Sequence, residues 1–494
     1  MAITAGTNLN SVPSAQKQTL SSNYIDFTST ATSGWAQQYM PDLMEKEAEV
    51  FGNRTISGFL SQVGAEEAMT SDQVVWSEQS RLHISLIGTV ITAGSTNGTF
   101  TVISDIDGNV SGDGFTVANH GVRTNDIVLI ASAGIVTQCL VVDADTAVIQ
   151  VEPYDKADLT GHATGGSASR LLVVGSEYAK GTSYLDGNGS AADSRTPANE
   201  ATFKSFSNKP IILKDYYEVS GSDASRIGWV EVSTEEGAGG YLWYLKAEAD
   251  TRARFTDYLE MAMLESVVGS NSTVVDTTLG ASADSGVGTQ GLFAAITDRG
   301  NITSGVTGVN AATDLAEFHA ILAEFDNQGA IEENMMFVNR ATSLAMDDML
   351  ASMNSYGAGG TSYGVFDNSE DMALNLGFSG FRRGSYDFYK SDMRYLNDKA
   401  TRGGINAAAT TAAIRGVIVP AGVSSVYDEM LGKNMKRPFL HVRYRASQTD
   451  NRKLKTWTTG SVGAATSALD AMQMHFLSER CLITQGANNF MLMK

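Results

Sequence analysis

An unusually long alternation of apolar and polar residues, over residues 73–86, constrains the fold more than any other feature of this sequence. A period of two predicts a β-strand with one buried face. Fourteen residues at about 3.3 Å each span roughly 45 Å, whereas an ordinary strand has about five or six residues. We expect this strand to project from the body of its domain. Its apolar side carries Val74, Trp76, Leu82, Ile84 and Leu86.

The extended pattern stops at Gly88 and resumes at residues 171–178, and the segment between them differs in composition. It consists of short β-branched runs separated by Asp-Gly and Gly-rich turns, at residues 99–103, 126–130, 138–142 and 147–151. Such spacing predicts a small antiparallel barrel or sandwich. The sequence therefore predicts a β-domain at residues 88–170, inserted into a hairpin whose arms are residues 73–87 and 171–180.

The longest helical pattern covers residues 239–268, and a capping-box pair, Ser233 with Glu236, precedes it. Thirty residues make a helix of about 45 Å. Charge pairs at i and i+4, Glu248 with Arg252 and Asp250 with Arg254, support its exposed face by about 0.3 kcal/mol each. We expect the helix to pack on a sheet. Its apolar stripe, which Arg252 and Thr256 interrupt, carries Leu242, Leu245, Ala249, Leu259, Met263 and Val267.

The other segments give shorter patterns. Residues 1–34 are polar with scattered apolar residues and predict an arm, and residues 40–51 and 55–63 predict helices. Residues 201–232 are extended, and residues 269–310 are a Ser/Thr/Gly-rich connection. An α/β layer follows, with a helix from Asp314, a strand at 335–338, a helix at 341–353 and a buried strand at 413–420. The last part predicts a hairpin of strands 439–445 and 453–459, with Lys453, Lys455 and Trp457 on one face, and another strand pair at 472–484.

Composition places the chain among ordered proteins of about three domains, since it has 494 residues and is 43% hydrophobic. Only 18% of residues are charged, below the usual share of about 25%. Low charge favours a subunit covered by copies of itself, although a large β-rich monomer is also possible. The net charge of −20 opposes binding to phosphate backbones and argues against a sequence-reading DNA protein.

The two cysteines, Cys139 and Cys481, cannot build a disulfide framework or a thiolate metal site within one chain. A reducing, intracellular origin is expected. Residues 1–16 lack the cationic and apolar parts of a signal peptide, and no run of 18 apolar residues predicts a membrane span.

Signatures of catalysis and cofactor binding are missing. The glycine clusters at 237–240 and 357–360 lack the spacing of phosphate loops, and Gly432-Lys433 is followed by Asn434 instead of Ser or Thr. The histidines fall in no metal-binding pattern and are expected to be surface or core residues. A triad assembled by the fold stays open. We predict no enzymatic activity, no cofactor and no catalytic residue. The histidines are His83, His120, His162, His319, His441 and His475.

One acidic turn in the inserted segment is a weak candidate for calcium binding. It contains Asp105, Asp107, Asn109 and Asp113, but the spacing of an EF-hand, with its central Gly and closing Glu, is absent. Asp, Asn and Gly are also ordinary turn formers. A turn is the favoured interpretation.

Three stretches carry a resemblance to a known family: Trp-Ser-Glu-Gln-Ser-Arg-Leu-His at 76–83, Phe-Ser-Asn-Lys-Pro-Ile-Ile-Leu-Lys at 206–214 before Tyr-Glu-Val-Ser-Gly at 217–221, and Gly-Trp-Val-Glu at 228–231. These stretches, with the order of elements, resemble Hong Kong 97-type major capsid proteins of tailed bacteriophages, and the crAss-like phages in particular. The resemblance implies an α+β fold of the Hong Kong 97 type with an inserted all-β domain.

The resemblance also implies a domain order. The expected parts are an N-terminal arm (1–34), N-terminal helices with an extended loop (35–87 and 171–205), the inserted β-domain (88–170), a peripheral domain (206–309) with a spine helix (238–268), an axial domain (310–420), and a return to the peripheral domain (421–494).

The function implied is structural. Such proteins self-assemble into pentamers and hexamers of an icosahedral head that encloses double-stranded DNA without sequence-specific binding. Their partners are a scaffolding protein and a portal during assembly, and head decoration or fibre proteins. The implied location is the virion capsid, assembled in the cytoplasm of the bacterial host, without a membrane. Some relatives form covalent crosslinks between subunits. No motif in this sequence indicates that chemistry, and we predict that such crosslinks are absent.

Two other functions stay open. An encapsulin-like compartment shares the fold and needs a cargo enzyme, and the long inserted segment argues for a phage instead. An extracellular β-rich adhesin or hydrolase needs a secretion signal or a convergent catalytic site, and neither is visible. An arm and a projecting hairpin gain burial only across neighbouring copies, and the inserted domain is in a position to bridge them.

Overall fold

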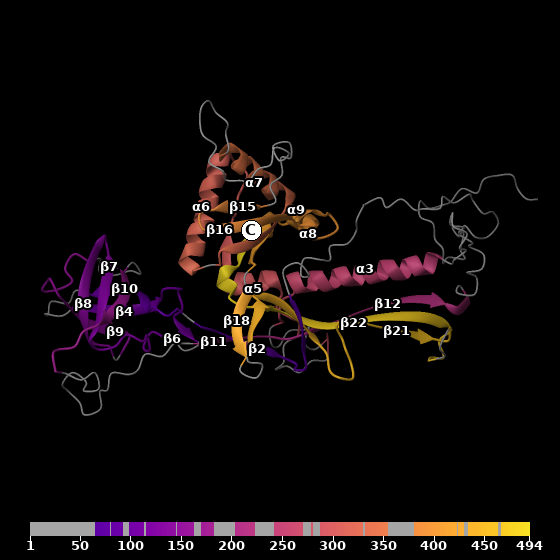
Figure 1. Ribbon diagram of the computed structural model, residues 1–494, viewed down its shortest axis with the longest axis horizontal. Coiled ribbons are helices and arrows are strands. Elements are labelled where there is room, and N and C mark those ends of the chain that lie inside the picture. The colour runs from indigo at the N-terminus through magenta and orange to yellow at the C-terminus, as the bar shows by residue number, and fades with distance from the viewer. Residues whose placement is uncertain are drawn as a thin grey trace, which may run out of the picture. The chain divides into compact units, whose positions relative to one another are not determined.

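The computed structural model describes residues 65–79, 81–91, 98–112, 115–144, 146–162, 169–181, 203–222, 242–269, 278–279, 287–329, 331–353, 380–421, 423–428, 433–462 and 466–494. The arm predicted at 1–34 and the helices predicted at 40–51 and 55–63 lie outside these residues. The chain divides into two compact units, one of residues 71–209 and one of residues 210–494 together with the chain up to residue 70. Figure 1 labels the elements.

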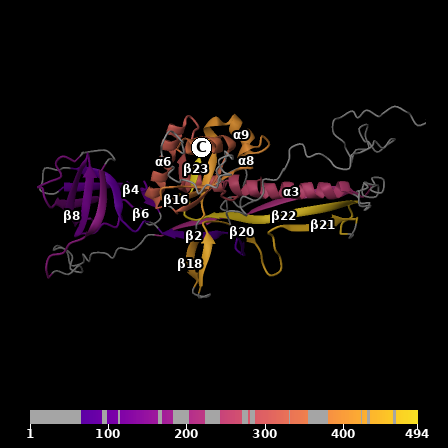
Figure 2. The same cartoon turned by 45° about the horizontal axis from the view of Figure 1, so that its top comes forward.

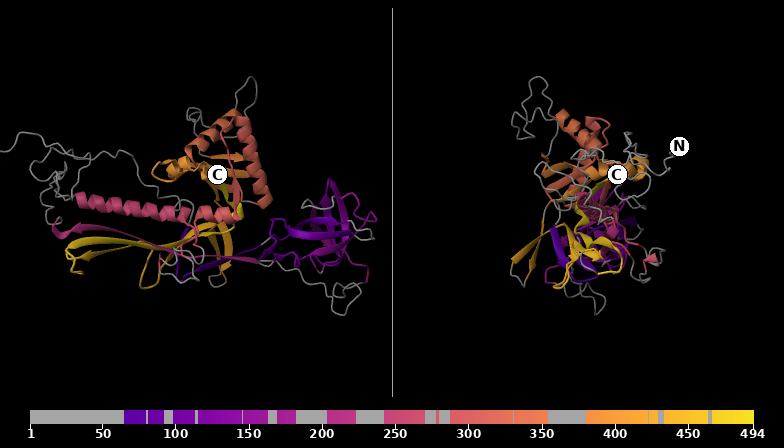
Figure 3. Two further views of the ribbon diagram at one scale, coloured as in Figure 1. Left: turned by 180° about the vertical axis from the view of Figure 1, so that it is seen from behind. Right: turned by 90° about the vertical axis from the view of Figure 1, so that its right-hand side faces the viewer.

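Six strands of the first unit form a closed barrel in the order β10-β3-β4-β9-β8-β7. Burial alternates strictly along β4 and β7, as expected of strands with one face inside a barrel. The barrel can be seen from behind in Figure 3. Its strands are β3 (Ser85–Ile91), β4 (Gly98–Asp105), β7 (Asp126–Ser132), β8 (Ile135–Asp143), β9 (Val148–Pro153) and β10 (Ser169–Ser176), and a small ladder joins β5 (Ser111–Gly112) to β6 (Phe115–Thr116).

The single long strand predicted at 73–86 is wrong. The segment forms two strands, β2 (Val74–Gln79) and β3, which pair with different partners. Strand β2 pairs with β11 (Phe203–Asn208) in a separate ladder, while β3 belongs to the barrel. The chain must bend between two sheets, and Leu82, predicted on the apolar side, lies exposed at this bend. Arg81 holds the bend through an ion pair with Asp107, 2.9 Å away.

The second unit contains a long sheet in the order β1-β20-β22-β12, with β21 also paired to β22. The central strand β22 (Ala471–Thr484) pairs antiparallel with all ten residues of β12 (Ile211–Ser220). On its other side it pairs first with β21 (Lys455–Gly460) and then with β20 (Leu440–Arg445). Strand β1 (Ala65–Met69) pairs parallel with β20 at the edge.

Two predictions for the end of the chain are therefore wrong. Residues 472–484 form one continuous strand instead of a strand pair. Segments 439–445 and 453–459 do not form a ladder with each other, because both pair with β22. An isolated bridge joins Ala446 and Asn451 in the turn between them.

A second sheet of the same unit has the order β13-β23-β17-β14-β16-β15. Phe318, Phe325, Phe381 and Phe388 fill the core that helices α6 and α7 share with it. The predicted helix from Asp314 is α6, which Asn310 caps by accepting a hydrogen bond from the Thr313 amide. These elements are β13 (Asn301–Thr303), β23 (Met491–Met493), β17 (Gly416–Pro420), β14 (Glu333–Val338), β16 (Tyr386–Asp392), β15 (Gly380–Arg383), α6 (Ala311–Gln328) and α7 (Arg340–Met353).

The remaining elements join these parts. The connection predicted at 269–310 contains a buried helix, α5 (Leu292–Arg299), and strand β13. Short helices α8 (Arg394–Asn397), α9 (Arg402–Ala408), η3 (Thr410–Ala412) and η4 (Ala487–Asn489) follow. Strands β18 (Val423–Asp428) and β19 (Lys433–Pro438) form a hairpin of their own. The Gly-rich loop noted at 357–360 lies outside the described residues.

Candidate assembly surfaces

The long helix α3 (Leu242–Glu265) covers one face of the long sheet. Figures 1 and 2 show it running along β12 and β22. Phe255 is 1% exposed, and its ring lies 6.0 Å from that of Phe476 on β22, with Leu213 and Met474 packed beside them. The side chains of β12 alternate between this covered face and the opposite one. Helix α3 therefore covers one face of the long sheet and leaves the other face without a helix from the described residues.

The apolar stripe predicted for this helix needs correction. Leu259 and Met263 are buried, but Ala249 is exposed, and Val267 is 69% exposed because the helix ends two residues before it. Leu242 and Leu245 belong to α3, but their side chains lie outside the described residues. The buried stripe runs at a spacing of four through Thr251, Phe255, Leu259 and Met263. Its members Thr251 and Phe255 each come one residue before Arg252 and Thr256. Arg252 and Thr256 therefore lie next to the stripe and do not interrupt it.

The carboxylate of Glu265 fixes the end of this helix. It accepts hydrogen bonds from the Tyr395 hydroxyl, at 3.0 Å, and from Arg402, at 2.7 Å. Arg402 also donates to the carbonyl of Ala412, at 3.0 Å. Burial, with the nearby Glu265 charge, raises the pKa of Tyr395, so its hydroxyl stays a hydrogen-bond donor. The end of α3 is thereby linked to the short helices α8 and α9 that follow β16.

The face of the sheet turned away from α3 carries a row of three stacked rings. Tyr216 on β12, His475 on β22 and Trp457 on β21 stand directly opposite one another in the ladders. The His475 ring lies 6.2 Å from that of Tyr216 and 5.1 Å from that of Trp457. Oγ1 of Thr459 lies 2.7 Å from Nε2 of His475 and orients its ring. Tyr216 remains 58% exposed and Trp457 38%, and the exposed Ile212 lies four residues from Tyr216 on the same face of β12.

This row could not be predicted from the sequence. Local alternation predicts Trp457 on a face with Lys453 and Lys455, and the lack of a metal-binding pattern predicts His475 as a surface or core histidine. Only strand pairing brings the three rings together. Large aromatic side chains that are half exposed are typical of protein contact surfaces.

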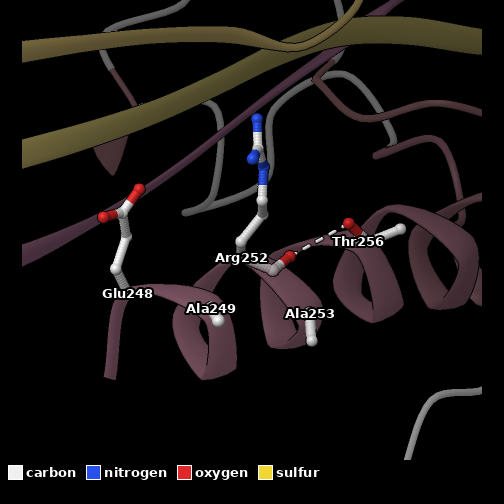
Figure 4. Close-up of a pocket in the computed structure, with 5 residues that line it drawn as sticks. All are labelled: Glu248, Ala249, Arg252, Ala253 and Thr256. Carbon is white, nitrogen blue, oxygen red and sulfur yellow. Dashed lines mark hydrogen bonds between the residues drawn. The ribbon is translucent and has the colours of Figure 1, made fainter. Parts of the chain in front are cut away.

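A shallow pocket lies on the exposed side of α3 (Figure 4). Glu248 and Arg252 extend from one side of the helix, next to the small residues Ala249 and Ala253, and Thr256 donates a hydrogen bond to the Arg252 carbonyl at 2.9 Å. A second pocket lies between α3 and α9, lined by Met261, Tyr395 and Ile405 among others.

A cluster of charges joins β22 to its neighbours at the end of the sheet near β1. Glu479, whose side chain is 6% exposed, lies 2.9 Å from Arg445 and 2.9 Å from Arg452. Arg443 pairs with Glu67 of β1 at 3.0 Å. Arg480 is buried and donates to the carbonyl of Lys453 at 2.9 Å. Through Arg443 and Glu67, the cluster holds the edge strand β1 against β20.

The weak calcium candidate is a turn in the structure. Asp105 accepts hydrogen bonds from the amides of Asp107 and Asn109, at 3.0 and 2.7 Å, and from the Asn109 side chain at 2.7 Å. Asp107 pairs with Arg81. Asp113 lies outside the described residues. Within the described ranges, no three His, Cys, Asp or Glu side chains gather as a metal site.

The remaining sequence candidates are distributed over both units. His83 and His319 are on the surface, and His441 is buried against the Pro438 carbonyl. Burial raises the pKa of Cys139 and of Cys481 to about 12, so both thiols stay protonated and unreactive. None of the helices in the described part of the chain is long and apolar enough to cross a membrane.

Two buried histidines link loops to the barrel. Nδ1 of His120 accepts a hydrogen bond from the Val122 amide at 3.2 Å, while Nε2 lies 3.0 Å from the Thr146 carbonyl. An imidazole that accepts on one nitrogen and donates on the other must be neutral. His162 lies between Oγ of Ser132 and Oγ1 of Thr137, each 2.9 Å away. Burial lowers the pKa of both histidines, and Lys156 lowers that of His162 further.

The barrel is therefore expected to lose stability in mild acid. The unfolded chain binds a proton near the ordinary histidine pKa of 6.5, before the folded barrel does, so the free energy of unfolding falls as the pH decreases below that value. Buried Asp126, whose pKa burial raises above 3.8, acts in the opposite sense only at more acidic pH. Thermal unfolding from pH 7.5 to 5.5 measures the effect. The variant His120→Gln should flatten the pH dependence, and an unchanged slope would count against the neutral-histidine explanation.

Comparison with known proteins gives weak structural likenesses. No family model matches the chain, and no curated protein matches it. A solved structure from Microbacterium phage Oxtober96 is 9% identical, with a TM-score of 0.36, over 92% of this chain and 96% of that one. The capsid structure of Cyanophage P-SCSP1u is 9% identical, with a TM-score of 0.31, over 62% and 79%. The mature capsid of bacteriophage PhiM1 is 8% identical, with a TM-score of 0.31, over 68% and 93%.

Proposed function

We propose that this chain is a major capsid protein, whose copies self-assemble into pentamers and hexamers of the icosahedral head that encloses the double-stranded DNA of a tailed phage. The observation that carries the proposal is the one-sided cover of the long sheet. Helix α3 buries one face, whereas the other face presents Tyr216, Trp457 and Ile212 among the described residues. A subunit that completes its burial against neighbours has this construction.

On this proposal, the parts of the chain take the places of a Hong Kong 97-type subunit resembling those of crAss-like phages. Helix α3 and the long sheet serve as the spine and peripheral domain, and the second sheet with α6 and α7 serves as the axial domain. The β2–β11 ladder belongs to the extended loop, and the barrel is the inserted domain. The barrel includes β3 and β10, so it takes in the ends of both expected hairpin arms (73–87 and 171–180) and extends past the expected inserted domain (88–170). The second sheet includes β13 and β23, which lie outside the expected axial domain (310–420).

The electrostatics suit a container for DNA. The net charge of −20 opposes tight binding of the phosphate backbone, so enclosed DNA can slide along the wall. The role is structural instead of enzymatic, and it requires no cofactor. The expected partners are scaffolding and portal proteins during assembly, then decoration or fibre proteins on the virion.

Sedimentation velocity of the purified full-length chain, alone and with its scaffolding protein, tests the proposal. We expect most of the protein to sediment as large particles of uniform size in at least one of the two conditions. A chain that remains a monomer or small oligomer in both contradicts the proposal. Particles that enclose a protein cargo would contradict the phage assignment and support an encapsulin-like compartment.

A further inference from the structure

The outer surface of the barrel is divided into a polar part and an apolar part. On β4 and β9 the outward positions include Thr99, Thr101, Gln150 and Glu152, as expected for a surface in water, with Ile103 and Val148 as apolar members. On β7, β8 and β10 the outward positions are mostly apolar. We define the apolar barrel face by Leu129, Ala131, Val136, Leu140, Leu172 and Val174.

Strand pairing makes these side chains contiguous. Leu172 stands opposite Leu129, and Ala131 stands opposite Val136. Leu140 stands opposite Ile127, another outward residue. Val136 is 63% exposed and Val174 60%. Leu172, Leu129, Ala131 and Val136 are therefore neighbours across three strands, and Leu140 lies further along β8. Val174 follows Leu172 along β10, where the pairing with β7 shifts between residues 173 and 175.

The barrel does not use this patch for its own folding. Its interior is filled by a separate set of buried side chains, including Phe100, Ile130, Val141 and Leu171. The closed strand order leaves no free strand edge that a neighbour needs to cover. A contiguous apolar patch outside a complete core is the mark of a contact surface.

Charge selects the occupant of this surface. The chain carries −20, so two copies repel each other wherever acidic surfaces meet. The outward positions of β7, of β8 up to Val142 and of β10 up to Val174 include no acidic residue. Their polar members are Gln138 and Arg170. Arg170 stands opposite Ala131 on one side of the face, and Glu152 of β9 stands opposite Leu140 on the other side. The face therefore has one cation and one carboxylate at opposite borders, and these can pair between two copies of the chain.

We propose that the apolar barrel face packs against the same face of a second copy of this chain. This inference rests on the proposed function, because it assigns a contact between subunits of one shell. A stable interface between two isolated proteins buries about 800 Å² on each partner, from about 20–30 residues. This face supplies far fewer residues, so the contact is weak in an isolated pair and gains strength when a closed lattice repeats it.

A cysteine placed on the face tests the symmetric contact directly. The variant Val174→Cys brings two introduced thiols together across the interface, whereas the native Cys139 and Cys481 are buried. We expect oxidation of assembled particles to give disulfide-linked dimers on a non-reducing gel. The control Gln150→Cys, on the polar part of the same barrel, should give no dimer above background. Absence of dimer with Val174→Cys, or equal dimer with the control, overturns the proposal.

A charge placed on the face tests its contribution to assembly. Leu172→Lys should raise the protein concentration needed for assembly at least tenfold, while Gln150→Lys should leave it unchanged. The melting temperature of the unassembled chain should be unaffected by either change, since both side chains point outward. Assembly of Leu172→Lys at the wild-type concentration overturns the proposal. Failure of the wild-type chain to form particles instead contradicts the proposed function, so the two failures are distinguishable.

Discussion

Replacing Phe255 with alanine is expected to lower the free energy of unfolding of the unit that contains α3 by about 3–5 kcal/mol, the usual cost of removing a large buried aromatic ring. Phe255 is 1% exposed and packs on Phe476 between the helix and the long sheet. In this cluster the buried members among the described residues are Phe255, Leu259 and Phe476, while Met263 and Leu264 of the same helix pack in a second cluster with Leu482 of β22. Removal of the Phe255 ring leaves a cavity in the first cluster, next to Leu259 and Phe476.

Urea unfolding of the full-length chain, followed by a signal from this unit, measures the loss. Tyr258→Ala is the matched control, since Tyr258 lies on the same helix but is 45% exposed and lies outside the buried stripe. Its substitution should change the free energy by no more than about 0.5 kcal/mol. Equal losses for Phe255→Ala and Tyr258→Ala would mean that α3 is not held on the sheet by this ring pair.

Replacing Glu479 with glutamine is the second large effect that we expect, at about 3 kcal/mol, because it leaves two arginines without their shared carboxylate. Arg445 and Arg452 each lie 2.9 Å from Glu479, and the Glu479 side chain is 6% exposed. The loss should appear as a lower urea midpoint for the unit that contains the long sheet, together with faster proteolysis near β1. The substitution Asp450→Asn serves as control.

The control works because its ion pair is in solvent. Asp450 pairs with Lys455 at 2.7 Å, but both side chains are more than 40% exposed, so water and salt screen the pair. Its removal should leave the midpoint nearly unchanged. A loss for Asp450→Asn as large as that for Glu479→Gln would show that burial of Glu479 is not the cause.

Patterns within a single segment of the sequence predicted several helices and strands. The helix from Asp314 and the strand at 335–338 correspond to α6 and β14. The β-branched run at 126–130 corresponds to β7, where burial alternates although residues 127–131 are all apolar. The helix was predicted from its period and the strands from short runs of apolar and β-branched residues, and both signals lie within one segment of the chain.

Strand partners could not be predicted in the same way. The alternation of residues 73–86 continues through Arg81, although β2 and β3 pair with different strands there. Ser478, Glu479 and Arg480 suggest a break in β22, but side chains and carbonyls from distant residues satisfy them and the strand continues. Helix α5 was missed because it is short and lies inside a Ser/Thr/Gly-rich segment.

For the candidate assembly surfaces, too, local patterns could be predicted but strand partners could not. The sequence suggested a long helix on a sheet, but placed its buried stripe one position away from Phe255. The row of Tyr216, His475 and Trp457 combines strands that are far apart in the chain, so alternation within each strand gives no sign of it. The apolar barrel face likewise depends on which strands are neighbours in the closed order.

Electron cryomicroscopy of the purified full-length chain, expressed with and without its scaffolding protein, tests the central claim most directly. The account predicts closed icosahedral shells with five-fold and six-fold clusters of this chain, and density for the α3 helix and long sheet in every subunit. Images that contain only monomers, small oligomers or open fibres in both conditions would contradict it.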